Sequence, residues 1–73
     1  MSKDAKVRKV VGTKIRELRK DGGFSQESLA AAAKLSAKYV GELERGQANP
    51  TVEVLAQLAR ALKTTASNLV AGI

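Results

Sequence analysis

The feature that most constrains this fold is a series of short segments in which apolar residues recur every three or four positions. In the first of them, Val7, Val11, Ile15 and Leu18 follow one another at i, i+4, i+8 and i+11. This spacing places the four side chains on one face of a helix over about 6–20. No segment alternates with period two for long enough to be a strand, and no repeat is visible. The sequence therefore predicts an all-α chain.

Capping residues and glycines divide the rest of the chain into further helices. Asp21-Gly22-Gly23 ends the first helix, Ser25 and Ser36 are N-cap candidates, and Gly46 is a helix terminator. Five helices are predicted, and the first three span about 6–20, 26–33 and 37–45. The fourth is capped by Thr51 and has the apolar stripe Val52, Leu55, Leu58, Ala59 and Leu62. The fifth is a short helix that is capped by Thr65 and holds Leu69 and Val70.

Length and residue types exclude several classes of protein. The chain has 73 residues, so we expect a single domain over 1–73. It has no cysteine and no histidine, which excludes disulfides, thiolate or imidazole zinc sites and catalysis by Cys or His. No glycine-rich phosphate loop, catalytic triad or metal-ligand spacing is present. We therefore expect neither an enzyme nor a cofactor or metal site.

Hydropathy gives no sign of a membrane protein. No stretch approaches the roughly 20 apolar residues of a membrane span, and no apolar segment follows the basic N-terminus as in a signal peptide. The expectation is a cytoplasmic protein with no membrane partner.

The positive charge lies at one end of the chain. Residues 1–20 carry eight basic and two acidic side chains, which accounts for the whole net charge of +6, and residues 21–73 are neutral. We expect residues 1–5 to form a flexible basic arm. A basic arm and first helix on a neutral body favour a polyanionic partner, nucleic acid first and an anionic membrane second. A merely solvated tail is the alternative.

The second and third predicted helices, separated by residues 34–36 alone, form either an ordinary helical corner or a DNA-reading helix-turn-helix. Small and apolar residues stand at positions 4, 5, 8, 10, 15 and 18 counted from Gln26, namely Leu29, Ala30, Ala33, Leu35, Val40 and Leu43. Ala30 matters most, because helices that cross at close range need a side chain no larger than methyl at the contact. This six-position pattern beside a basic arm favours the helix-turn-helix.

These residues resemble a known family. The run SQESLAAAAKLSAKYVGELERG, preceded by KIRELRKDGGF and followed by NPTVEVLAQLARAL, is similar to the five-helix lambda-repressor-like helix-turn-helix domain of the XRE family. The resemblance covers about residues 11–70, and YVGELERGQ is closest to restriction-modification controller proteins. The family usually has Gly in the turn, where this chain has Lys34. A non-glycine residue in a left-handed conformation costs about 1 kcal/mol.

The resemblance implies a role for individual residues, with the third helix in the major groove. The implied base contacts are Ser36, Ala37, Lys38, Gly41 and Glu42, and the implied phosphate contacts are Gln26, Tyr39, Arg45, Gln47, Asn49 and Lys14. Bland alternatives exist for four of them: Ser36 as a cap alone, Glu42 as a solvated side chain, Tyr39 as part of the core, and Gly41 as a glycine that the helix merely tolerates. Arg19 and Glu44 match a structural pair that bridges the first helix and the end of the third.

A dimer is expected because a single reading helix covers only a few base pairs. The uncharged C-terminal residues Asn68, Val70 and Ile73 are the candidates for its interface. The predicted function is that of a transcriptional regulator that binds double-stranded DNA as a homodimer on a palindromic operator. RNA polymerase and a toxin are the further partners considered. The alternative function is a protein-interaction module of the antitoxin type that uses the same fold.

Overall fold

The computed structural model describes residues 3–72, and these residues form five α-helices and no strand. The helices are α1 (Lys3–Asp21), α2 (Gln26–Ala33), α3 (Ala37–Glu44), α4 (Val52–Ala61) and α5 (Ala66–Leu69). The predicted all-α fold is confirmed, and α2 has the predicted bounds. No helix within 3–72 is long and apolar enough to cross a membrane.

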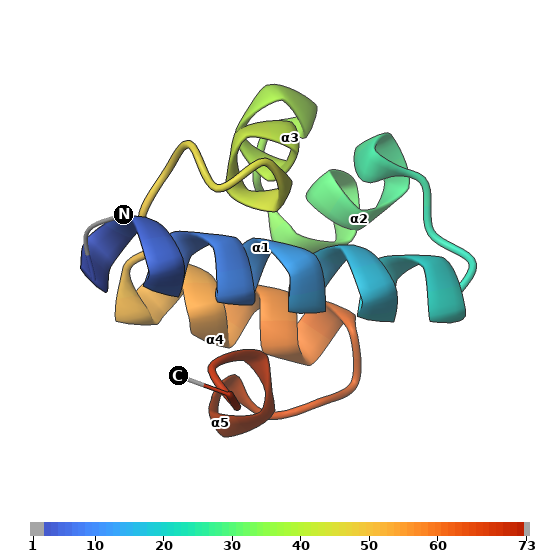
Figure 1. The fold of residues 1–73 in the computed structure, drawn as a ribbon. Helices are drawn as coiled ribbons and strands as arrows, with labels where there is room; N and C mark the ends of the chain where they lie inside the picture. Colours follow the sequence, from blue (N-terminus) through green and yellow to red (C-terminus); the bar gives the residue numbers. More distant parts are fainter. Residues whose placement is uncertain (1–2, 73) are drawn as a thin grey trace.

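The long helix α1 runs through the middle of the molecule (Figure 1). Helices α2 and α3 lie on one side of it, and α4 and α5 lie on the other. α3 packs against α1 and α2, and α4 packs against α2 and α5. This arrangement leaves α3 at the surface on the side opposite α5.

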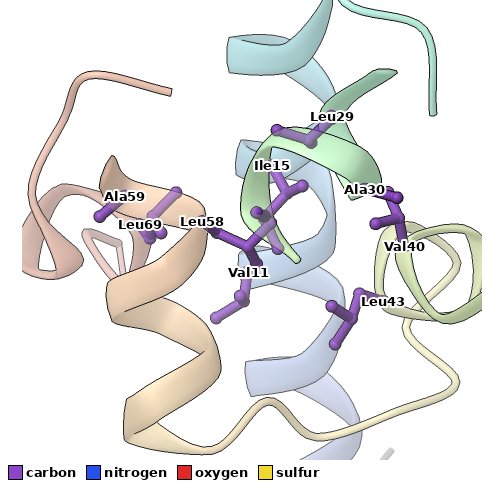
Figure 2. Packing of buried hydrophobic residues seen from close by; sticks show 10 residues of the cluster. Val11, Ile15, Leu29, Ala30, Val40, Leu43, Leu58, Ala59 and Leu69 are labelled. Carbon is purple, nitrogen blue, oxygen red and sulfur yellow. The ribbon is translucent and has the colours of Figure 1, made fainter. Parts of the chain in front are cut away.

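One apolar core joins all five helices (Figure 2). Ile15, Leu29, Val40, Leu58 and Leu69, each from a different helix, have no exposed surface. Burying a side chain of this size contributes about 1.5–3 kcal/mol to stability. The core therefore fixes the position of α3 relative to α1 and α2.

Each of the four shorter helices begins at the residue that the sequence predicts. Ser25, Ser36, Thr51 and Thr65 all have extended backbone, and the side-chain oxygen of each accepts a hydrogen bond from the backbone N–H three residues later. At Ser25 the bond is reciprocal, because the Ser28 hydroxyl oxygen accepts from the Ser25 N–H. These caps satisfy amide groups that a helix start otherwise leaves without a partner.

The first four helices end in the same way, with one residue in the left-handed conformation. Gly23 follows α1 and Gly46 follows α3, both at positive φ, as a glycine terminator permits. Lysine takes that position elsewhere: Lys34 follows α2 with φ 61°, and Lys63 follows the end of α4 with φ 57°. The turn between α2 and α3 thus has the left-handed geometry without the glycine.

The start of α1 differs from the prediction. The helix begins at Lys3 rather than near residue 6, so residues 3–5 of the expected flexible arm are helical, and residues 1–2 lie outside the described part. Asp4 stands in the first turn of α1, where its negative charge stabilises the N-terminus of the helix. No glycine or proline stands between Lys3 and Val11. The basic residues of this end are therefore held on a helix.

Candidate nucleic-acid interface

The α2–α3 corner is built on small side chains. Ala30 is 2% exposed and lies at the contact between the two helices, while Val40 and Leu43 of α3 are buried beneath it. After α2, the Lys34 N–H donates to the Ala31 carbonyl and the Leu35 N–H donates to the Ala30 carbonyl, which closes the helix end. The corner thus sets the direction in which α3 leaves the turn.

The N-terminal half of α3 presents polar groups to solvent. Ser36 and Lys38 are exposed, whereas Ala37 is half-buried against the core and Glu42 is half-buried. The Ser36 side-chain oxygen accepts a hydrogen bond of 3.0 Å from the Tyr39 N–H, so the residue caps the helix whether or not it also contacts DNA. In the N-terminal half of α3, Lys38 is therefore the long side chain that can donate hydrogen bonds from the solvent-exposed face.

Gly41, which we expected to face the bases, is buried in the structure. A Cβ atom built at Gly41 would lie 3.1 Å from Arg45 Nη1 and 3.6 Å from Gln26 Oε1. The position is covered by the ends of two side chains rather than open to solvent.

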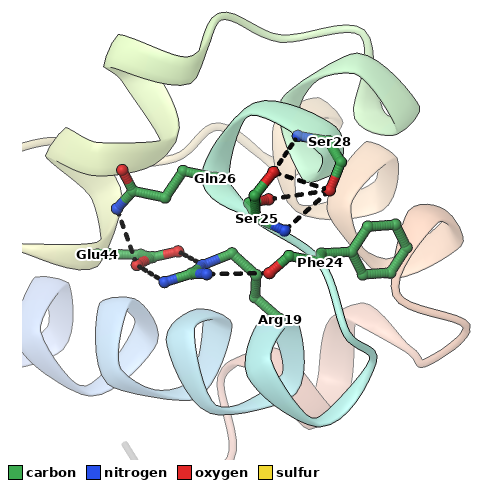
Figure 3. A network of polar contacts seen from close by, with 6 residues as sticks. All are labelled: Arg19, Phe24, Ser25, Gln26, Ser28 and Glu44. Carbon is green, nitrogen blue, oxygen red and sulfur yellow. Dashed lines mark hydrogen bonds and ion pairs between the residues drawn. The ribbon is translucent and has the colours of Figure 1, made fainter.

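Arg19 and Glu44 meet between α1 and the end of α3 (Figure 3). Arg19 Nε and Nη2 donate to the two carboxylate oxygens of Glu44 over 2.6 and 3.0 Å, and Arg19 Nη1 donates to the Phe24 carbonyl over 3.0 Å. Gln26 joins the network, because its Nε2 donates to Glu44 Oε1 over 3.2 Å. The network thus ties the start of α2 to α1 and α3.

The network also changes the local charge. The Arg19 and Glu44 side chains are 12% and 4% exposed, so their pairing occurs largely away from water. The hydrogen bonds that Arg19 donates to the Glu44 carboxylate raise the pKa of the Arg19 guanidinium above its ordinary value; burial opposes this rise, and the charge of the carboxylate adds to it. Arg19 thereby neutralises Glu44, one of the acidic side chains of α2 and α3. This removes a repulsion that would oppose binding of a phosphate.

Three predicted phosphate contacts, Arg45, Gln47 and Asn49, follow α3 directly and are exposed. Arg45 Nε donates to Gln47 Oε1 over 3.1 Å, so these two side chains orient each other. Tyr39 is half-buried and packs against the core, as the bland alternative for that residue describes. The loop after α3 therefore carries the oriented polar groups.

Lys14 is not brought together with the other predicted phosphate contacts. It lines a shallow cleft with Lys9, Val10 and Ala71, on the side of α1 that faces the end of the chain. The reason is helical geometry: Gly12 is the α1 residue in contact with the α3 backbone, and two residues further along a helix the side chain points about 200° away.

Sequence reasoning missed two basic residues near the loop after α3. Arg8 Nε donates to the Gly46 carbonyl over 3.2 Å. The exposed Lys9 has its backbone and Cγ next to Gly46. The positive charge of the first helix was a signal, but only the contact between α1 and this loop shows which of its charges lie there.

The predicted dimer residues differ from one another. Asn68 is exposed, and its Nδ2 donates to Thr64 Oγ1 within the same chain. Val70 is half-buried against the core, so part of its apolar surface is already covered. Ile73 lies outside the described residues.

Acidic side chains do not gather into a metal site in the part of the chain that the structure describes. The exposed and partly exposed polar groups around α3 include amide, hydroxyl, ammonium and guanidinium groups, together with the carboxylates of Glu27 and Glu42. The amide, hydroxyl, ammonium and guanidinium groups donate hydrogen bonds to phosphates and to base edges.

Comparison with known proteins agrees with this geometry. The helix-turn-helix family model HTH_3 matches residues 15–69. An uncharacterized HTH-type transcriptional regulator, y4dJ of Sinorhizobium fredii, is 42% identical over 88% of this chain and 83% of its own length. The HTH-type transcriptional regulator DdrOP3 of Deinococcus deserti is 38% identical over 82% of this chain, which spans 46% of that relative.

The fold is also similar to a solved controller protein. The crystal structure of the restriction-modification controller protein C.AhdI from Aeromonas hydrophila superposes with a TM-score of 0.83. The two sequences are 40% identical, over 85% of this chain and 94% of that one. The likeness to a controller protein expected from the sequence is confirmed.

Proposed function

This chain belongs to the HTH_3 helix-turn-helix family of DNA-binding transcriptional regulators, and from that membership we propose that two copies of it bind a palindromic operator with α3 of each copy in the major groove. The observation that carries the proposal is the position of Lys38. It is exposed in the N-terminal half of α3, whereas Val40 and Leu43 of the same helix are buried. A helix held by its inner face, with a long donor on its outer face, fits the groove geometry of this motif.

In this proposal the residues around α3 divide into two sets. Lys38 donates to guanine O6 and N7, with Ser36, Ala37 and Glu42 close to neighbouring bases. Arg45, Gln47 and Asn49 contact phosphates, and Gln26 does so at the start of α2, where a helix N-terminus favours anions. We do not include Gly41, which is buried, or Lys14, which lines the cleft near Ala71, among the proposed contacts.

The proposal is tested by selection of duplexes from a random-sequence pool. We expect a two-fold symmetric motif whose half-site centres lie about 10 base pairs apart, because dimers of this kind place their reading helices one DNA turn apart. The Lys38→Ala variant should then lose about 1–3 kcal/mol of preference at one base pair of each half-site. Lys63→Ala, which removes the same charge beyond α4, is the control and should select the wild-type motif.

Two results would contradict the proposal. No enriched motif, together with duplex binding that does not weaken with salt, would favour the protein-interaction module, because phosphate neutralisation makes affinity fall steeply with salt. Equal loss of operator and arbitrary-sequence binding in Lys38→Ala would make Lys38 a phosphate contact instead.

A further inference from the structure

A glycine in the middle of α3 needs a physical reason. Gly41 is the fifth residue of an eight-residue helix, and apart from proline no residue is less favourable in a helix interior. Its φ is not positive, unlike that of Gly23, Gly46 and Gly72, so the backbone conformation does not require a glycine. The remaining reason is the space that a side chain would occupy.

That space is filled by two side-chain ends. The atoms nearest to a Cβ at Gly41 would be Arg45 Nη1 at 3.1 Å, Gln26 Oε1 at 3.6 Å and Arg45 Cζ at 3.8 Å. All three belong to flexible side chains. An alanine could therefore be accommodated without moving the backbone, but only by displacing the Arg45 guanidinium.

The two side chains are held from their other sides. Arg45 Nε donates to Gln47 Oε1, and Gln26 Nε2 donates to Glu44 Oε1, whose charge Arg19 neutralises. Among the described residues, the terminal nitrogens Nη1 and Nη2 of Arg45 have no hydrogen-bond partner. The Arg45 guanidinium thus lies over Gly41, and its Nη1 and Nη2 groups can donate hydrogen bonds to a ligand.

The start of α2 adds further donors beside it. The reciprocal cap uses the N–H groups of Ser25 and Ser28, which leaves those of Gln26 and Glu27 without an intrahelical acceptor. The end of the Gln26 side chain, from the first residue of α2, lies next to Gly41 as the Arg45 guanidinium does.

We propose that Gly41 is a positioning residue: its missing side chain lets the Arg45 guanidinium lie across α3 beside the start of α2, so that both hold the same DNA phosphate. A guanidinium and backbone amides together supply charge-assisted hydrogen bonds to one anionic group. The inference rests on the proposed DNA binding and assigns to Gly41 a role through Arg45 rather than through a base.

The test compares Gly41→Ala with wild type on a duplex of arbitrary sequence about two helical turns long. The variant should unfold at an unchanged or higher temperature, because alanine is the better helix former. Its affinity for the duplex should nevertheless fall about tenfold, and the slope of log affinity against log salt should shrink by about one. A packing role alone would lower the unfolding temperature, and that result would overturn the inference.

A double-mutant cycle with Arg45→Ala isolates the route of the effect. If Gly41 acts through Arg45, Gly41→Ala should cost nothing further in the Arg45→Ala background. An undiminished cost there, or a loss confined to the selected operator, would mean that Gly41 approaches the DNA itself. If the wild-type protein binds no duplex, the proposed function is overturned together with this inference. If the wild-type protein and the Gly41→Ala variant bind the duplex with equal affinity, this inference alone is overturned.

Discussion

Gly12 lies where α1 meets the C-terminal end of α3, and this contact depends on the absence of a Cβ atom at Gly12. A Cβ at Gly12 would overlap the Leu43 carbonyl oxygen and lie 2.9 Å from the Glu44 carbonyl oxygen. Both are backbone atoms at the C-terminal end of α3. The close approach of α1 to α3 therefore requires glycine here, and it brings Arg19 within reach of Glu44.

We predict that Gly12→Ala destabilises the protein by about 3 kcal/mol, because the clash is with backbone and can be relieved only by moving α3 away from α1. Chemical denaturation followed by circular dichroism measures the change. Thr13→Ala, at the exposed neighbouring position, is the matched control and should have little effect. An unchanged unfolding free energy in Gly12→Ala would show that α3 can shift at no cost.

The ends of the first four helices share one geometry but differ in the residue that adopts it. Gly23 and Gly46 take the left-handed position that follows α1 and α3, but Lys34 and Lys63 take it near the ends of α2 and α4. A side chain in that conformation carries a steric cost of about 1–2 kcal/mol that glycine avoids. Two of the four ends are therefore less stable than they could be.

Lys34→Gly and Lys63→Gly should each raise the free energy of unfolding by about 0.5–1 kcal/mol. The steric cost is removed, and the larger conformational entropy of glycine in the unfolded chain offsets part of the gain. Thermal and denaturant unfolding give the values. Lys34→Ala removes the charge but keeps a Cβ, so it should show no such gain; an equal gain in Lys34→Ala would attribute the effect to charge.

Each molecule has a single helix α3. The Cα atoms of the whole molecule extend 31 Å along its longest axis. Two reading helices about 34 Å apart, one per DNA turn, thus need a second copy. The proposed contact lies at α5, where Asn68 is exposed. Val52 at the start of α4 is the large apolar residue most exposed within 3–72, at 80%, and marks the alternative contact surface.

We predict that Asn68→Lys shifts the protein from dimer to monomer, because a symmetric interface places the two new charges close together without a partner. Sedimentation over a range of protein concentrations measures the assembly state, and circular dichroism checks that the helices remain. Val52→Lys is the comparison variant and should stay dimeric. A monomer in Val52→Lys and a dimer in Asn68→Lys would place the interface at the start of α4.

The sequence by itself determined what depends on near neighbours along the chain. The apolar stripes, the caps Ser25, Ser36 and Thr51, and the break at Gly22-Gly23 act over a few residues, so the helices and their order could be predicted from them. The end of α2 at Ala33 was predicted as well, whereas the left-handed conformation of Lys63 was not, because lysine carries no local signal for it. The start of α1 was also misjudged, since the charge of its first residues suggested an arm.

The tertiary structure alone decided which residues of different helices meet. Lys14 and Lys9 look alike in sequence and line the same shallow cleft near Ala71, yet Lys9 also lies beside Gly46. Gly12 and Gly41 both stand inside a helix, but one admits the α3 backbone and the other admits Arg45. The rotation of each helix about its axis depends on how the whole core packs, and a pattern within one helix does not contain that information.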